Sequence, residues 1–189
     1  GEAVVEGVGL GLGLPEGDRA LLRGLTSDPF WCLRVIRYPP LAAAPASAAG
    51  LAEHPRSEPL SCGEHSDYGL LTVVNQDPKE RPGVPAALQV RNAAGAWVEA
   101  EPVPGLFVCN IGDMFRVLTD GLYVPTVHRV VHAGSEAARV SLPFFYEPSF
   151  DARVAPLPSL ARGRGPSLEG VVYGDHLLRK VRGNFELGA

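Results

Sequence analysis

The stretch Arg139-Val-Ser-Leu-Pro-Phe-Phe-Tyr-Glu-Pro148 closes a series of short β-rich segments, most of which follow His65. It starts with an arginine and a hydroxyl two positions apart, Arg139 and Ser141, whose side chains would share one face of a strand. An arginine that points into a β-barrel is costly unless an anion meets it, and its planar guanidinium group suits a carboxylate. Taken alone, the pattern is explained more simply by an arginine at a solvent-exposed edge. The other polar residues of the series decide between this interpretation and a carboxylate-binding arginine.

About eight short β-rich segments, separated by turn residues, are predicted around this stretch. They are residues 30–38, 70–74, 87–91, 96–99, 106–110, 114–118, 127–131 and 140–146. The sequence Asn92-Ala-Ala-Gly95 predicts a hairpin between two of them. Many short strands at close spacing are typical of a β-sandwich or a jelly roll, so a mainly β fold is expected.

Three other segments complete the expected organisation. Residues 15–26 and 173–185 predict helices, and residues 41–60, rich in Ala, Pro and Ser, predict a loop. The second helix is expected to carry its apolar side on Leu177, Leu178 and Val181. The fold class is therefore mainly β with flanking helices.

Composition excludes several classes of protein. A chain of 189 residues with 46% hydrophobic and 20% charged residues is long enough for one globular domain with a substantial core. The net charge of −4, the pI near 5.7 and the lack of a dense Lys/Arg block argue against a nucleic-acid partner. No segment is expected to span a membrane, because the most apolar early stretch, residues 4–14, is short and interrupted by Glu6 and by glycines.

The cysteines indicate a cellular compartment, and the first residue bears on whether a segment precedes the chain. Cys32, Cys62 and Cys109 form no Cys-x-x-Cys pair, which favours free thiols in a reducing compartment and a cytoplasmic location. Cys109, in an apolar run, is expected to be a small core residue. The only methionine is Met114, so Gly1 is not an ordinary translation start and an upstream segment is expected.

A metal-ligand pattern stands at the start of the β-rich series. His65 and Asp67 are two residues apart and would share one face of a strand. An isolated His-x-Asp is more often an incidental surface pair, so a third ligand is needed. His128, within the β-branched run of residues 124–131, is the candidate, although a hydrogen-bonded core histidine would look the same. His132 competes with it.

Two histidines and one carboxylate can occupy one face of an iron ion and leave the opposite face open. His54 and His176 are expected in solvated roles, the first in the loop and the second in the late helix. A zinc hydrolase is disfavoured because the sequence has no His-Glu-x-x-His motif. The pattern therefore favours an oxygen-activating iron centre.

These residues occur in an order that resembles a known family. The matching stretches are Leu33–Pro40, His65–Thr72, Ala87–Val90, Val108–Met114, Thr126–Val130 and Arg139–Pro148. Together they resemble the C-terminal half of the iron(II)- and 2-oxoglutarate-dependent dioxygenases of the isopenicillin N synthase-like superfamily. The resemblance covers roughly residues 15–185. It implies a double-stranded β-helix, a jelly-roll barrel that holds iron near its open end.

The resemblance also implies a role for each site residue. His65, Asp67 and His128 would bind Fe(II), with O2 taking an open position. The distal carboxylate of 2-oxoglutarate would be held by Arg139, Ser141 and Tyr38. The family turn at Asn110, Gly112 and Asp113 is interpreted as structural. In many plant members an asparagine stands where this chain has Ile36, which bears on co-substrate placement.

The function implied is oxidation of a small organic substrate, by hydroxylation or desaturation, coupled to decarboxylation of 2-oxoglutarate. We expect residues 1–189 to form a single catalytic domain with a jelly-roll core at roughly residues 30–148, lacking an upstream N-terminal domain. No nucleic-acid, membrane or protein partner is evident. Two alternatives stay open. One is an oxidase that works without 2-oxoglutarate, as isopenicillin N synthase and aminocyclopropanecarboxylate oxidase do, and the other is an inactive binding homologue.

Overall fold

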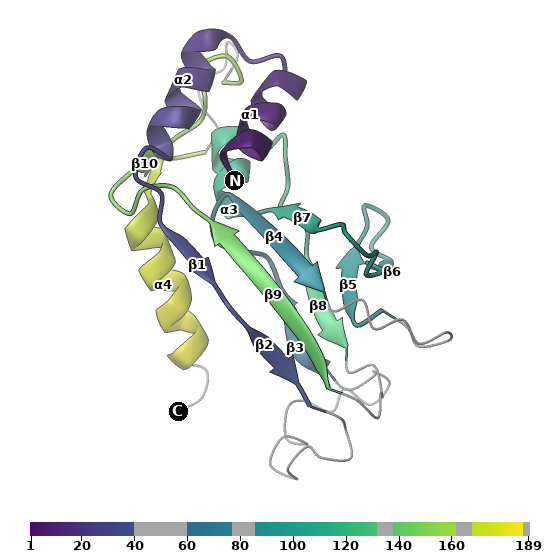
Figure 1. The fold of residues 1–189 in the computed structure, drawn as a ribbon. Helices are drawn as coiled ribbons and strands as arrows, with labels where there is room; N and C mark the ends of the chain where they lie inside the picture. Colours follow the sequence, from purple (N-terminus) through teal and green to yellow (C-terminus); the bar gives the residue numbers. More distant parts are fainter. Residues whose placement is uncertain (40–59, 77–85, 132–137, 162–167, 187–189) are drawn as a thin grey trace.

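The structure is a computed structural model that describes residues 1–39, 60–76, 86–131, 138–161 and 168–186 (Figure 1). The elements within these ranges are α1 (Glu2–Gly11), α2 (Glu16–Leu25), β1 (Trp31–Leu33), β2 (Ile36–Tyr38), β3 (Leu60–His65), β4 (Leu71–Gln76), β5 (Leu88–Arg91), β6 (Trp97–Glu99), β7 (Val108–Ile111), α3 (Asp113–Leu118), β8 (His128–Val131), β9 (Arg139–Tyr146), β10 (Arg153–Val154), β11 (Val171–Val172) and α4 (Tyr173–Glu186). No helix in these ranges has the length and apolar character needed to cross a membrane.

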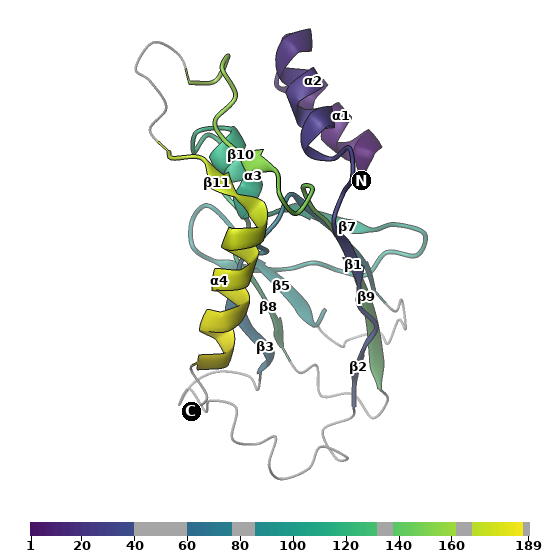
Figure 2. The ribbon, with the colours of Figure 1, turned by 90° about the vertical axis from the view of Figure 1, so that its left-hand side faces the viewer.

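Two antiparallel sheets face each other (Figure 2). The first has the order β1-β9-β4-β7, and β2 pairs with the other end of β9; the second has the order β3-β8-β5-β6. The small pair β10-β11 lies apart from both. Helix α4 runs along the side of this sandwich where β1 and β3 form the sheet edges (Figures 1 and 2). The expectation of a mainly β jelly roll with flanking helices is confirmed.

The predicted strand at residues 30–38 is divided into β1 and β2. The break falls at Arg34 and Val35, opposite the region of Pro143 in β9, and the Arg34 N–H donates to the Pro143 carbonyl at 3.0 Å. A proline has no N–H to return that bond, so the regular ladder stops there. The two halves still pair with β9 on either side of the break.

The local structure differs from what the sequence analysis predicted at three places. Residues 114–118 belong to helix α3, which buries Met114, Phe115 and Leu118, so packing overrides the β-like appearance of this short segment. Helix α1 was not predicted because its glycines hide its helical periodicity, yet it buries Val5 against the core. Residue 60, assigned to the loop, begins β3; the rest of that loop lies outside the described residues.

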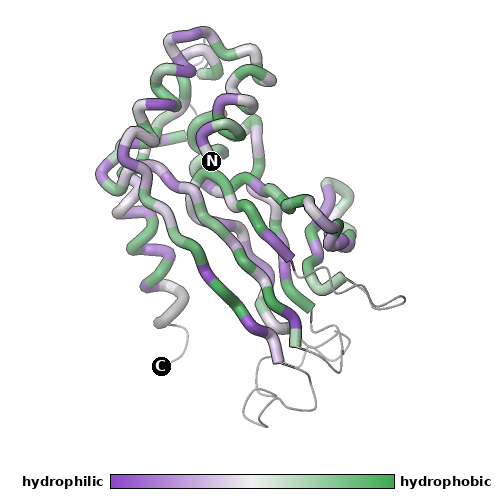
Figure 3. The backbone as a smooth tube through the Cα atoms, viewed as in Figure 1, coloured by the Kyte–Doolittle hydropathy of each residue, from purple (hydrophilic) through white to green (hydrophobic). Residues whose placement is uncertain are grey.

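Helix α4 forms where expected, but its faces are not as predicted. Leu177 packs against the core, whereas Leu178 and Val181 are exposed. Hydrophilic and hydrophobic residues alternate along the helix (Figure 3). Tyr173 is buried and the His176 side chain is only partly exposed, so polar as well as apolar residues of α4 face the protein.

The main apolar core lies between the helices and one end of the five-stranded sheet. It contains Val5, Leu14, Leu22, Leu70, Leu71, Met114, Phe115, Leu118, Tyr146, Val154, Leu157 and Tyr173. A much smaller cluster centred on Leu88 and Val130 lies between the sheets. The sheets themselves bury several polar side chains, among them Thr72, Gln76 and Ser141. Buried polar groups need hydrogen-bond partners, so the sandwich interior is the part of the molecule suited to chemistry.

Candidate metal and carboxylate site

His65, Asp67 and His128 lie together between the two sheets. His65 ends β3 and His128 begins β8, and the two are direct cross-strand partners with ring centroids 4.2 Å apart. Asp67 lies two residues beyond β3, so a bend of the chain, and not the alternation of a strand as predicted, brings its carboxylate to the histidines. One ligand atom from each residue falls within 4.8 Å of the others. Within the described residues this is the single cluster of metal-ligand type.

The two imidazole rings are oriented by backbone carbonyls. The Nδ1 of His65 lies 2.8 Å from the Gly63 carbonyl oxygen, and the Nδ1 of His128 lies 3.0 Å from the Thr126 carbonyl oxygen. A carbonyl oxygen can only accept, so Nδ1 carries a hydrogen in both rings and Nε2 is the nitrogen available to a metal. The Nε2 atoms lie 3.9 Å and 3.7 Å from Asp67 Oδ1, so the two nitrogens and this oxygen lie close to one another.

Asp67 is held by its other carboxylate oxygen. Oδ2 accepts hydrogen bonds from Thr72 Oγ1 at 2.5 Å and from Asn110 Nδ2 at 2.6 Å. Thr72 and Asn110 are themselves partners across β4 and β7, so the two donors come from adjacent strands. Oδ1 therefore remains directed at the two imidazole nitrogens. Sequence reasoning missed Thr72 and treated Asn110 as structural; the available signal was an asparagine in an otherwise apolar strand.

This donor set fits an iron ion. Two imidazole nitrogens and one carboxylate oxygen form the facial triad typical of non-haem Fe(II), and each ligand has its second polar atom engaged by the protein. The sulfur of Cys62 lies 3.8 Å from His65 Nδ1. Its hydrogen bond is the main cause that raises the pKa of His65 to about 9, whereas burial acts in the opposite direction. A metal ion must displace the proton on Nε2, so metal binding competes with acid.

The residues expected to hold a carboxylate also lie together. Tyr38 and Arg139 are cross-strand partners in β2 and β9, with the guanidinium carbon 5.2 Å from the Tyr38 ring centroid. Ser141 is buried on the same strand. Arg139 Nη2 donates to Gln76 Oε1 at 2.8 Å, and Gln76 Nε2 donates to the Ala100 carbonyl at 3.0 Å. Gln76 was missed by sequence reasoning, and its two bonds fix the position of the arginine.

Tyr38 and Cys62 pack against the same small apolar cluster between the sheets, and Cys62 also touches His65. The carboxylate candidates and the metal candidates therefore border one interior region. Burial raises the pKa of Tyr38 above its ordinary value, so its hydroxyl remains a hydrogen-bond donor at neutral pH.

The chain segment that carries Asp67 is bonded directly to the start of α3. The Asp113 N–H donates to the Asp67 carbonyl at 2.8 Å, and the Met114 N–H donates to the Gly69 carbonyl at 2.9 Å. A Cβ at Gly112 would lie 2.4 Å from the Gly69 carbonyl oxygen, a distance that no side chain tolerates. The turn at residues 110–113 is therefore part of the support of the site.

Two expectations for single residues were wrong. His176, expected to be solvated, has a side chain only 16% exposed and lies 3.4 Å from Asp113 Oδ2. Cys109, expected in the core, is exposed. It points to the outer face of β7, whereas its neighbours Val108 and Asn110 point to the opposite face and are partly buried. His54 and His132 lie outside the described residues.

Comparison with known proteins agrees with this geometry. The sequence profile of the 2OG-Fe(II) oxygenase superfamily matches residues 30–148. The chain therefore belongs to the 2OG-Fe(II) oxygenase superfamily.

The relatives include proteins named as hydroxylases and proteins named as oxidases. A homoarginine-6-hydroxylase of Oryza sativa subsp. japonica is 45% identical over 96% of this chain and 51% of its own length. A 1-aminocyclopropane-1-carboxylate oxidase of Dictyostelium discoideum is 30% identical over 80% of this chain and 44% of its own. The crystal structure of JOX2 in complex with 2OG, Fe and JA matches with a TM-score of 0.74 at 26% identity, over 94% of this chain and 47% of that one. The chain thus spans about half the length of the relatives it matches.

Proposed function

We propose that His65, Asp67 and His128 bind one Fe(II) ion through the two Nε2 atoms and Asp67 Oδ1. The observation that carries the proposal is the convergence of these three atoms within 4.8 Å, each on a side chain whose remaining polar atom is already hydrogen-bonded. Side chains fixed in this way need little rearrangement to bind a metal. Three protein ligands leave the rest of the coordination sphere for a co-substrate and O2.

The co-substrate in this proposal is 2-oxoglutarate, with its distal carboxylate on Arg139. The guanidinium group is oriented by Gln76, and the buried hydroxyl of Ser141 and the protonated hydroxyl of Tyr38 are the further donors. A charge-assisted, two-pronged contact of this kind is strong in a sheltered interior. The family membership and the likeness to JOX2, whose structure contains 2OG and Fe, support the assignment.

The reaction would oxidise a small organic molecule while 2-oxoglutarate loses CO2 and becomes succinate. For a hydroxylation, one atom of O2 enters succinate and the other enters the product. The bound iron would supply the activation of O2. The protein residues hold the metal, orient the co-substrate and keep water from the interior. Homoarginine is the first substrate to test, because a homoarginine-6-hydroxylase is 45% identical to this chain.

The proposal extends to domain organisation and location. Residues 1–189 are proposed to act as one catalytic domain whose jelly-roll core is roughly residues 30–148. The described cysteines, Cys32, Cys62 and Cys109, are all free thiols, which supports the proposed cytoplasmic location.

The second candidate is an oxidase that uses O2 without 2-oxoglutarate. It is favoured by the 30% identity to the Dictyostelium 1-aminocyclopropane-1-carboxylate oxidase. The two functions differ in one measurable requirement, which is the dependence of O2 consumption on 2-oxoglutarate.

The test is O2 uptake by the full-length protein, loaded with Fe(II) and given homoarginine or other small amino acids, with and without 2-oxoglutarate. The proposed function requires uptake and succinate release only when 2-oxoglutarate is present. Uptake that is equal without it supports the second candidate. An inactive binding homologue would bind Mn(II), a non-reactive stand-in for Fe(II), and consume no O2 with any substrate.

The ligand assignment is tested separately by Mn(II) binding. His128→Ala should abolish stoichiometric binding, because it removes one of three ligands. His132→Ala is the matched control and should bind as the wild type does. A requirement for His132 with tolerance of His128→Ala would show the ligand choice to be wrong.

A further inference from the structure

The face of α4 that meets the rest of the protein carries three polar side chains, Tyr173, His176 and Lys180. Their spacing of three and four residues places them in one row along the helix. Tyr173 is 1% exposed and the His176 side chain 16% exposed, whereas the Lys180 side chain, at the end of the row, is 41% exposed. Polar groups placed inward cost free energy unless they have partners, so the partners show what the row does.

The first partner is Asp113, at the start of α3. Its Oδ2 lies 2.9 Å from Lys180 Nζ and 3.4 Å from His176 Nε2. Its Oδ1 accepts a hydrogen bond from Ser66 Oγ at 2.9 Å, and its backbone N–H donates to the Asp67 carbonyl at 2.8 Å. Asp113 therefore connects α4 to the two residues that follow His65, one of which is the carboxylate ligand.

The second partner is Glu147, just beyond β9. Tyr173 donates its hydroxyl hydrogen bond to the Glu147 carboxylate, whose Oε2 accepts the Leu70 N–H at 3.1 Å. Glu147 Oε2 also fills the space where Gly69 has no side chain, since a Cβ there would lie 0.9 Å away. The same row of α4 thus reaches the far end of the segment 65–70.

Lys180 makes a further contact with this segment. Its Nζ lies 5.4 Å from the centroid of the Tyr68 ring, the residue after Asp67. Residues 66, 67, 68 and 70 are therefore each linked to α4, directly or through one intermediate side chain. The backbones of His65 and His128 are held in the β3-β8 ladder, whereas Asp67 lies outside any strand. Asp67 is therefore the ligand whose backbone position depends on the contacts with α4 and α3.

We propose that helix α4 positions the metal-ligand segment 65–70 through Asp113, so that His176 and Lys180 are positioning residues that set metal affinity although neither contacts the metal. The proposal rests on the metal site of the proposed function. If segment 65–70 became ordered only when the metal binds, the loss of conformational entropy would weaken metal binding. The contacts with α4 order this segment before the metal binds, so that cost is avoided.

The experiment measures the Kd for Mn(II) of the full-length protein by electron paramagnetic resonance, at a temperature where near-ultraviolet circular dichroism shows every variant folded. Lys180→Met and His176→Ala should each weaken Mn(II) binding about 10-fold, the size typical of residues that orient metal ligands. Arg179→Met is the matched control, because Arg179 is the neighbouring cation on the exposed side of α4. Lys180→Arg should restore most of the affinity.

A combination of variants tests the route through Asp113. If Lys180 acts through Asp113, the double variant Asp113→Asn/Lys180→Met should bind no more weakly than Asp113→Asn alone. Kd values within twofold of wild type for both α4 variants, or an equal loss in Arg179→Met, would overturn the inference. Failure of the wild type itself to bind Mn(II) would instead refute the proposed metal site, so the two failures are distinct.

Discussion

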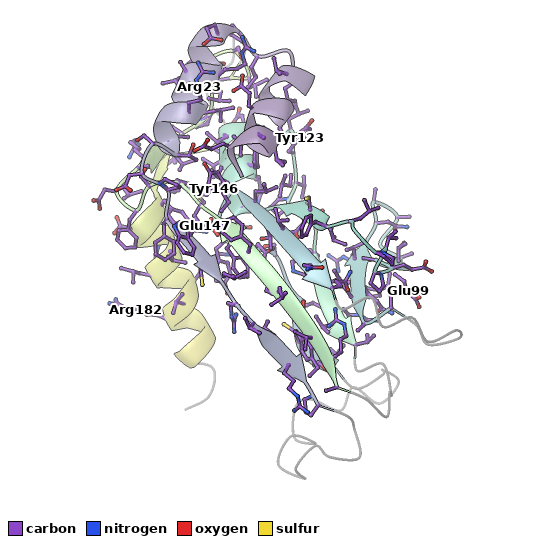
Figure 4. The ribbon with its side chains drawn as sticks, in the orientation of Figure 1. Arg23, Glu99, Tyr123, Tyr146, Glu147 and Arg182 are labelled. Carbon is purple, nitrogen blue, oxygen red and sulfur yellow. The ribbon has the colours of Figure 1, made fainter. Side chains whose placement is uncertain are left out.

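Glu147 should make the stability of the metal-free protein depend on pH in a window where an ordinary carboxylate would not. Its side chain lies beyond the end of β9, close to the start of α4 (Figure 4), and is only 5% exposed. Burial is the main cause that raises its pKa from 4.5 to about 7, and the charge of Asp67 adds to it, against the hydrogen bonds from Leu70 and Tyr173. The perturbation to make is Glu147→Gln, which keeps an acceptor for the Leu70 N–H and has no charge.

The sign follows from proton binding. Between pH 4.5 and about 7 the folded protein holds a proton on Glu147 that the unfolded chain has released. The folded state then binds more protons, so the free energy of unfolding falls as the pH rises through this window and is constant on either side of it. A pKa difference of one corresponds to about 1.4 kcal/mol, so the change from 4.5 to about 7 corresponds to about 3 kcal/mol.

The assay is urea unfolding of the metal-free protein, followed by fluorescence of its two tryptophans at several pH values from about 4 to about 8. The difference in unfolding free energy between wild type and Glu147→Gln should change by about 3 kcal/mol across the window, in favour of the variant at high pH. Every other ionisable group is common to both proteins, so its contribution cancels in the difference. Glu99→Gln is the control, because Glu99 also accepts a backbone N–H, from Ala86, but is exposed. Stability curves that stay parallel for wild type and Glu147→Gln would show that burial does not raise the pKa of Glu147.

Three further predictions concern the site itself. Asn110→Ala removes a donor to Asp67 Oδ2 and should weaken Mn(II) binding about 10-fold by titration, with the metal-free melting temperature little changed; equal affinity would show that Thr72 alone suffices. Arg139→Ala should weaken 2-oxoglutarate binding by about 3 kcal/mol in calorimetry, since it removes a charged, sheltered contact; an unchanged Kd would favour the oxidase without 2-oxoglutarate. Gly112→Ala should destabilise the protein by about 1–3 kcal/mol in urea, because the new Cβ meets backbone, whereas Gly63→Ala has open space and should not.

The sequence could predict the strands because their signals are local. The apolar stretch at 140–146 and the turn at Asn92–Gly95 are found in β9 and in the β5-β6 hairpin. Helix α3 could not be predicted, because it has six residues and its helical form is decided by packing of Met114 and Phe115 in the core. Helix α1 contains several glycines, and its formation likewise depends on tertiary contacts.

The site was predictable as a set of residue types but not as a set of contacts. His65, Asp67 and His128 stand out by spacing and by context, whereas Gln76, Thr72 and Asn110 look like ordinary polar residues in strands. What makes these three matter is the pairing of β4 with β7 and β9, and that register is not visible in one sequence. The polar row of α4 was missed for the same reason, since its partners come from residues far away in the chain.

The distribution of apolar and polar residues explains how one fold serves both stability and chemistry. The main apolar core lies outside the sandwich, under α1, α2 and α3, so it can stabilise the fold without filling the region between the sheets. That region can then bury Asp67, Gln76 and Ser141, each with hydrogen-bond partners or strand neighbours. The segment 65–70 belongs to both parts, because Leu70 lies in the core while Asp67 faces the histidines. A change in core packing near Leu70 should therefore be felt at Asp67 through the two intervening residues, Tyr68 and Gly69.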